Sequence, residues 1–203
     1  MTGIGESPAL PSAPVLQGHG LCLRPWDPGS ATDVDAWRRG HTDPEFLRWN
    51  TPLRTITDTA DAQESLRAKT ADMADGKSLT LCVTDAGDGT VLGQIGLNAV
   101  DRLMSSGNVG YWVLPEARGR QVATRALLLT TRWTYDELGL HRLELGHALG
   151  HEASCRTAER CGFRYEGTLR GAMWEAGRKD AFRDVHRHGR LATDPEPAFG
   201  GPR

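Results

Sequence analysis

The stretch PEARGRQVATRALLL, residues 115–129, decides the fold. Small and apolar residues such as Ala123 and Leu127 recur in it at helical spacing, which predicts a helix that starts near Arg118. A helix N-terminus is the positive end of the helix dipole, yet this one opens with Arg118 and Arg120. Two cations at a positive helix end predict that an anion binds there, because unpaired backbone N–H groups converge at the same place. A solvated helix end with outward-pointing arginines is the alternative.

The elements expected around this helix alternate between strands and helices. Alternating and continuous apolar patterns predict strands at 21–26, 78–85, 91–100, 108–114, 141–149, about 163–170 and 181–191. Helical periodicity predicts further helices at about 31–39 and 58–74, and a short one in EASCRTAERCGF that Gly162 closes. Since strands outnumber helices and several lack a crossover helix between them, the sheet must be mixed and the fold class is α+β.

Composition bounds the domain organisation and the partners of this chain of 203 residues. One domain is expected at 19–192, between tails at 1–18 and 193–203 that are rich in Gly and Pro and are expected to be disordered. The formal net charge of -2 argues against a protein that coats nucleic acid or an anionic membrane, and no apolar run is long enough to span a bilayer. The four cysteines form no CxxC pair and follow no secretory signal, which predicts reduced thiols and a cytoplasmic location.

The anion site is neither a P-loop nor a Rossmann fingerprint, because it lacks the Gly-Lys-Ser/Thr of the first and the glycine spacing of the second. Instead, GYWVLPEARGRQVATRAL resembles the acetyl-CoA-binding motif of the GNAT superfamily of N-acetyltransferases, Gln/Arg-x-x-Gly-x-Gly/Ala. GHEASCRTAERCGFRYEGTLR resembles the Asn-x-x-Ser and Gly-Phe region of the RimJ/RimL-like branch. LRPW, GQIGL and a late RDV strand also match this branch, in the right order over about residues 19–192.

This resemblance implies a fold and an activity. The fold is the GNAT (acyl-CoA N-acyltransferase) fold, a mixed and mostly antiparallel central sheet flanked by helices and splayed between the fourth and fifth strands, here 108–114 and 141–149. The activity is transfer of an acetyl group from acetyl-CoA to a primary amine by direct attack in a ternary complex. The branch suggests a protein or peptide N-terminal α-amino group as the acceptor, whereas related chains use small amines, amino acids or antibiotics.

Three alternatives stay open at this point. The chain could be a CoA-binding regulatory protein of GNAT fold with little or no turnover, a small-molecule amine acyltransferase that uses another acyl-CoA, or a binding module for another phosphorylated ligand. Fold alone does not decide among them. The resemblance also implies a homodimer, and neither a nucleic acid nor a membrane is expected as a partner.

Carried over residue by residue, the resemblance assigns the cofactor site. The loop and helix start would wrap the CoA pyrophosphate through Arg118, Gly119, Arg120, Gln121, Val122 and Ala123, with Thr124 adding a hydroxyl. The strand edge that pairs with the pantetheine arm would contain Tyr111, Trp112 and Val113. Two residues depart from the pattern, since Gln121 stands where the family usually has Gly and His151 stands where the branch usually has an Asn that organises the cofactor.

Two residues are the candidates for catalysis. Attack on a thioester needs a neutral amine, a proton acceptor and a proton for the leaving thiolate. Glu144 is the candidate base, because small residues share its strand face and GNAT enzymes often carry a catalytic Glu on this strand; an ion pair with Arg142 or another arginine is the alternative. Ser154 is the candidate donor to the thiolate, with a role in capping or in the first turn of a helix as the alternative.

Histidines are the remaining candidates for a functional site. His141, His147 and His151 do not have the spacing of a metal site with a partner Cys pair, so no metal is expected. The basic run RDVHRHGR, residues 183–190, is interpreted as a solvated strand face.

Overall fold

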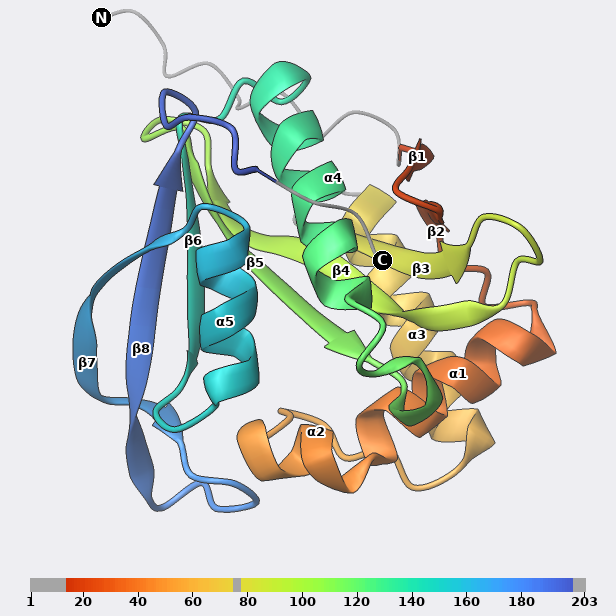
Figure 1. The fold of residues 1–203 in the computed structure, drawn as a ribbon. Helices are drawn as coiled ribbons and strands as arrows, with labels where there is room; N and C mark the ends of the chain where they lie inside the picture. The colour runs from red at the N-terminus through yellow and green to blue at the C-terminus, as the bar shows by residue number, and fades with distance from the viewer. Residues whose placement is uncertain (1–13, 75–77, 199–203) are drawn as a thin grey trace, which may run out of the picture.

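In the part of the chain that the structure describes, eight strands form one sheet in the order β1-β2-β3-β4-β5-β6-β8-β7. The structure, a computed structural model, describes residues 14–74 and 78–198 (Figure 1). The strands are β1 (Leu16–Gly18), β2 (Leu21–Pro25), β3 (Leu79–Asp85), β4 (Val91–Asp101), β5 (Ser106–Val113), β6 (Arg142–Ala148), β7 (Arg164–Trp174) and β8 (Phe182–Leu191). The helices are α1 (Ala31–Thr42), α2 (Pro44–Trp49), α3 (Thr59–Ala74), α4 (Val122–Asp136) and α5 (Glu152–Arg160), with a 3₁₀ turn at Pro115–Ala117.

Every pair of neighbouring strands is antiparallel except β5 and β6, which are parallel. The prediction of a mixed, mostly antiparallel sheet flanked by helices is therefore confirmed. The strands β5 and β6 pair over only three positions, of which the last joins Asn108 to Glu144. Beyond that position the two strands separate, and Figure 1 shows β5 running away from β6 toward the loop that leads into α4. The predicted splay lies here, one strand later in the count because β1 precedes the strands expected from the sequence.

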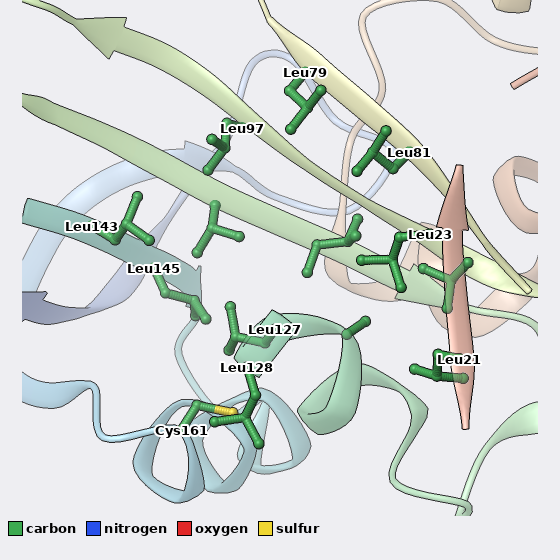
Figure 2. Close-up of a cluster of buried hydrophobic side chains, with 14 of the residues drawn as sticks. Leu21, Leu23, Leu79, Leu81, Leu97, Leu127, Leu128, Leu143, Leu145 and Cys161 are labelled. Carbon is green, nitrogen blue, oxygen red and sulfur yellow. The ribbon is translucent and has the colours of Figure 1, made fainter. Parts of the chain in front are cut away.

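Two apolar clusters bury the two faces of the sheet. The larger one lies under α4 and α5 and contains leucines of β2, β3, β4 and β6 together with Leu127 and Cys161 (Figure 2). The smaller one lies under α1 and α3 and contains Trp26, Trp37 and Trp112. Because side chains alternate along a strand, β5 contributes Trp112 to one cluster while Tyr111 packs against the other. Helices therefore cover both faces of the sheet.

The helix α4 starts later than the sequence predicts, at Val122 rather than near Arg118. Pro115 begins a separate 3₁₀ turn, and Gly119 has a φ of 74° while Gln121 has a φ of 56°, both in the left-handed region. A right-handed helix cannot run through such residues. The two arginines therefore lie in a loop before the helix. The predicted end of α5 is confirmed, since Gly162 has a φ of 79°.

Two short elements were not expected from the sequence. The helix α2 has six residues and begins at Pro44, where the side chain of Asp43 accepts a hydrogen bond from the backbone N–H of Phe46. The strand β1 falls within the stretch expected to be an N-terminal tail and pairs with β2. Residues 1–13 and 199–203 lie outside the described residues.

The segment 193–198 forms no helix or strand, but Asp194 accepts a hydrogen bond from the backbone N–H of Leu191. The division of the chain into one domain and two tails stays a prediction. None of the helices within 14–74 and 78–198 has the length and apolar character that crossing a membrane requires.

Candidate functional site

A cavity of about 440 Å³ opens in front of the N-terminus of α4, bounded by α2, β5 and α5. Eleven of the predicted site residues line it, namely Tyr111, Trp112, Val113, Arg118, Gly119, Gln121, Val122, Ala123, Thr124, His151 and Ser154. Arg120 and Glu144 are not among the residues that line it. The sequence therefore located most of this cavity, although the ring of Trp112 packs into the core on the other face of the sheet.

Backbone N–H groups without a partner inside the helix gather at the start of α4, beside this cavity. The first N–H groups of any helix lack a partner within the helix, and the side chain of Gln121, the N-cap residue of α4, makes no capping hydrogen bond. Arg125, which the sequence analysis overlooked, donates from Nη2 to the backbone carbonyl of Arg120 at 3.2 Å and from Nη1 to that of His19 at 2.7 Å. These bonds fix the loop from behind, so the helix N-terminus is a ready anion site.

The two arginines of this loop have different surroundings. Arg118 lines the cavity, and its guanidinium forms an ion pair with Asp43, the buried N-cap residue of α2. Arg120 is not a lining residue, and its Nη2 lies 3.5 Å from Oδ2 of Asp85. The sequence predicts an anion beside both arginines; only Arg118 lines the cavity, and the role of either residue in anion binding stays a prediction.

The helix α5 adds two cations to the cavity that the sequence analysis missed. Arg156 and Arg160 both line it, and they lie on one side of α5 because residues four apart in a helix are neighbours. Nη1 of Arg156 is paired with Oε2 of Glu152 at 3.1 Å. Arg160 makes no ion pair with any residue that the structure describes. The i, i+4 spacing of the two arginines was the signal available in the sequence.

A second, smaller cavity of about 120 Å³ occupies the gap between β5 and β6. Its walls come from residues 109–111 of β5 and residues 145–148 of β6. Both cavities are lined by Trp49, Asn50, Tyr111, His151 and Ser154. The helix N-terminus and the gap in the sheet therefore belong to one continuous site.

Ser154 and Tyr111 bring two hydroxyl groups together at the junction of the two cavities. Ser154 is buried in the first turn of α5 but does not cap the helix, since His151 holds the N-cap position. The hydroxyl of Tyr111 is buried and makes no hydrogen bond of normal geometry with a described residue. Burial raises the pKa of Tyr111 to about 12, and the neighbouring hydroxyls of Ser154 and Thr157 offset part of that rise. Tyr111 is therefore a protonated donor at neutral pH.

His151, which stands in place of the usual Asn, forms part of the wall between α2 and α5. Its ring stacks on Trp49 with centroids 4.6 Å apart and an angle of 6° between the planes. Burial lowers the pKa of His151 to about 4, with the nearby His147 contributing in the same direction. The imidazole is thus neutral at neutral pH. Its side chain makes no capping hydrogen bond to α5, so it does not replace an Asn side chain as the helix cap.

Glu144 lies at the closed end of the splay and lines neither cavity. Its Oε1 accepts a hydrogen bond from Nε of Arg142 at 3.0 Å, and its Oε2 accepts one from Nη1 of Arg187 at 2.6 Å. This arrangement favours the ion-pair alternative over the role of a base. Among the residues that the structure describes, Glu45 of α2 is the only carboxylate that lines either cavity.

Histidines gather beside the smaller cavity in a combination that the sequence did not suggest. His147 of β6 lies with His186 and His188 of β8 and with Cys155 of α5, whereas His141 is exposed and His151 belongs to the cavity wall. Burial lowers the pKa of both His147 and His188. The run at 183–190 is therefore not a solvated face throughout, because His188 is fully buried.

Comparison with known proteins identifies related sequences and folds. Residues 20–164 match the family described as "Acetyltransferase (GNAT) domain". A Bacillus subtilis protein named "Putative ribosomal N-acetyltransferase YdaF" is 32% identical over 90 residues, which are 44% of this chain and 49% of that protein. The chain thus spans about half the length of this curated relative.

Two solved structures share the fold. One is RimL, a ribosomal L7/L12 alpha-N-protein acetyltransferase in complex with coenzyme A, with a TM-score of 0.77 and 16% identity over 88% of this chain and 98% of that one. The other is Mycobacterium smegmatis RimJ in complex with CoA-disulfide, with a TM-score of 0.74 and 24% identity over 85% of this chain and 82% of that one. The predicted fold is confirmed by these likenesses.

The left-handed conformation of Gln121 predicts how substitutions at this position change the free energy of unfolding. A non-glycine residue loses about 1–2 kcal/mol of folding free energy when it adopts a left-handed conformation. Glycine avoids this strain, but it loses more conformational entropy on folding, which costs roughly 0.5–1 kcal/mol. Gln121→Gly should therefore keep or raise the free energy of unfolding, by up to about 1 kcal/mol. Gln121→Val should lower it by about 1–3 kcal/mol, because a β-branched residue is strained there. Urea denaturation measures both changes.

The comparison is Gln63→Gly within α3, which should lower the free energy of unfolding by about 1 kcal/mol or more, because it combines the low helix propensity of glycine with loss of the hydrogen bond from Nε2 of Gln63 to the carbonyl of Pro28. A loss of similar size in Gln121→Gly would contradict the account of the loop.

Proposed function

Because the chain belongs to the GNAT family of acetyltransferases, we propose that it transfers the acetyl group of acetyl-CoA to a primary amine in the gap between β5 and β6. The observation that carries this proposal is the continuity of the site. The larger cavity begins at an uncapped helix N-terminus suited to a pyrophosphate, and it adjoins the smaller cavity in the gap between strands, which is suited to a thioester.

Cofactor binding follows from these features. The pyrophosphate of CoA would accept hydrogen bonds from the backbone N–H groups at 119–124, with Arg118, Arg156 and Arg160 supplying positive charge. The pantetheine arm would extend along β5, whose edge has no strand partner on this side beyond Asn108 within the described residues. An extended amide chain can use the backbone groups that the splay leaves open. The thioester would then reach Ser154 and Tyr111.

The transfer itself needs few protein groups. The neutral amine nitrogen bonds to the thioester carbon, and the oxygen of the tetrahedral intermediate accepts hydrogen bonds from open N–H groups of β5. The carbon–sulfur bond then breaks, and the thiolate takes a proton from the hydroxyl of Ser154. Tyr111 restores that proton, since its protonated hydroxyl lies beside Ser154, and water then returns a proton to Tyr111. The proton that the amine loses leaves through water.

The charges around the site favour an α-amino group as the acceptor. At pH 7 about one α-amino group in ten is neutral, whereas fewer than about one lysine side chain in a thousand is. Among the described residues, Glu45 is the only carboxylate that lines the site, so few groups there can accept a proton. Such a site suits an α-amino group better than a lysine, because more of the α-amino group is already neutral. We therefore propose a peptide or protein N-terminus as the acceptor, with Glu45 attracting its ammonium form.

The same proposal extends to the cell and to the assembly. All four cysteines are unpaired, which suits the reducing cytoplasm. A homodimer is also proposed, on the resemblance to the RimJ/RimL-like branch.

The choice of acceptor is tested with matched peptides. One peptide has a free N-terminus and no lysine, and the other has a blocked N-terminus and one lysine. With acetyl-CoA, release of free thiol and a gain of one acetyl group by mass are expected for the first peptide only. Acetylation of the lysine peptide alone would contradict the proposal, and CoA binding without turnover on any amine would favour the regulatory alternative.

The two arginines of the loop give a prediction about CoA affinity. Arg118→Glu should weaken CoA binding at least about tenfold, or 1.4 kcal/mol, because it places a negative charge against the phosphates. Arg120→Glu should change affinity less than about threefold, because its side chain points away from the cavity. Calorimetry with CoA measures both. Equal losses in the two variants, or none in either, would contradict the proposed pyrophosphate site.

The carboxylates give a prediction about kinetics. Glu45→Gln should raise the KM for the peptide acceptor about tenfold with a smaller change in kcat, since a charge that attracts the ammonium is lost. Glu144→Gln should lower kcat by a similar factor at every pH from 6 to 9, because Glu144 lines neither cavity and acts by holding the closed end of the splay together through Arg187. Steady-state rates from pH 6 to 9 measure both. A fall of about 10²–10⁴-fold in Glu144→Gln that high pH partly rescues would instead identify Glu144 as the base.

A further inference from the structure

Three histidines and one cysteine converge where α5 covers the paired strands β6 and β8. One ligand atom each from His147, Cys155, His186 and His188 lies within 4.8 Å of the other three. His147 and His186 are directly opposite each other in the antiparallel register. His188 is two residues beyond His186, so it lies on the same face of β8. Cys155 reaches this face from α5, and its Sγ is 3.6 Å from Nε2 of His188.

The hydrogen bonds of this cluster cannot all be satisfied by the protein alone. Nδ1 of His147 lies 3.1 Å from the carbonyl oxygen of Ala148, so Nδ1 carries the proton and Nε2 has a bare lone pair. That lone pair faces Nε2 of His188 at 3.2 Å. If Nε2 of His188 donates to it, the buried Nδ1 of His188 is an unsatisfied acceptor, since it makes no hydrogen bond of normal geometry with a described residue. If Nδ1 carries the proton instead, two lone pairs face each other.

A cation at the centre of the cluster removes this conflict. Both Nε2 atoms would then be ligands, and both Nδ1 atoms would carry protons. The bond from Nδ1 of His147 to the Ala148 carbonyl is the kind of contact that orients a metal-binding imidazole.

The spacing of the ligand atoms fits a tetrahedral ion. With zinc–nitrogen bonds of about 2.0–2.1 Å and a zinc–sulfur bond of about 2.3 Å, two nitrogens are about 3.3 Å apart and a nitrogen and the sulfur about 3.6 Å apart. The measured separations are 3.2 Å between the two Nε2 atoms and 3.6 Å between Sγ of Cys155 and Nε2 of His188. Two edges of the tetrahedron are therefore already present.

We propose that His147, Cys155, His186 and His188 bind one Zn²⁺ ion in a closed tetrahedral site. Three imidazoles and a thiolate are ligands that zinc and cobalt(II) prefer over magnesium or calcium. The thiol of Cys155, whose Sγ lies 3.8 Å from Oε1 of Glu159, releases its proton to solvent as the sulfur binds the ion. With four protein ligands the site has no open position, so the ion is structural and takes no part in chemistry.

The ion would tie α5 to the sheet directly beneath the smaller cavity. Cys155 follows Ser154 in the chain, and His147 lines the same cavity as Ser154. Fixing Cys155 to β6 and β8 therefore fixes the first turn of α5 and the hydroxyl of Ser154. The metal site rests on its own ligands and does not depend on the proposed acetyl transfer.

Cobalt(II) titration of the untagged full-length protein, stripped of metal, tests the site. We expect saturation at one equivalent, with the visible bands of a tetrahedral ion and a near-ultraviolet band from sulfur-to-cobalt charge transfer, both abolished by Zn²⁺. Zn²⁺ should also raise the Tm of the metal-free protein. Absence of saturable binding at one equivalent in the wild-type chain would overturn the proposal without reference to any variant.

Matched variants assign the ligands. Cys155→Ser should abolish the charge-transfer band, and His188→Gln should weaken cobalt binding at least tenfold. Cys22→Ser and His141→Gln are the controls, because neither residue belongs to the cluster, and both should bind as the wild type does. A charge-transfer band that persists in Cys155→Ser, or that is lost in Cys22→Ser, would place the sulfur ligand elsewhere and overturn the proposed site.

Discussion

The end of the β5–β6 ladder at Asn108 and Glu144 is the constraint on which the rest of the site depends. Nη1 of Arg187 lies 3.0 Å from Oδ1 of Asn108 and 2.6 Å from Oε2 of Glu144, so one guanidinium joins three strands where the pairing stops. Charge-assisted hydrogen bonds in this half-buried position are among the stronger polar contacts of a protein. They hold the closed end together while the strands part beyond it. Backbone groups left open on the inner edge of β5 then need partners, and an extended ligand supplies them.

The walls of the site depend on one another because side chains link them in series. Arg118 of the loop pairs with Asp43, which caps α2. At its other end α2 places Trp49 against the ring of His151, at the start of α5. A ligand that contacts the loop therefore acts on α2 and α5 as well. His151, which stands where the branch usually has Asn, maintains this link by stacking on Trp49. It makes no capping hydrogen bond to α5.

Local pattern in the sequence was sufficient for the long elements and insufficient for the details of the site. The periodicity of α4 and of the alternating strands is a property of neighbouring residues, so it could be predicted. The left-handed conformation of Gln121 could not be predicted, because no feature of a polar residue in the sequence indicates it. The surrounding loop imposes this conformation. Helix α2 is too short to show periodicity. The spacing of His186 and His188 was visible, but their association with His147 and Cys155 depends on the long-range register of β6 and β8 and on the position of α5.

The central claim is that the pantetheine arm of a CoA ester lies along the open edge of β5 and that its pyrophosphate binds at the start of α4. Hydrogen exchange of the backbone amides, followed with and without CoA, tests it most directly. The account predicts slower exchange on CoA binding at 119–124 and at 109–113, and unchanged exchange in β3 on the far side of β4. Protection confined to other segments, or no protection at saturating CoA, would contradict it.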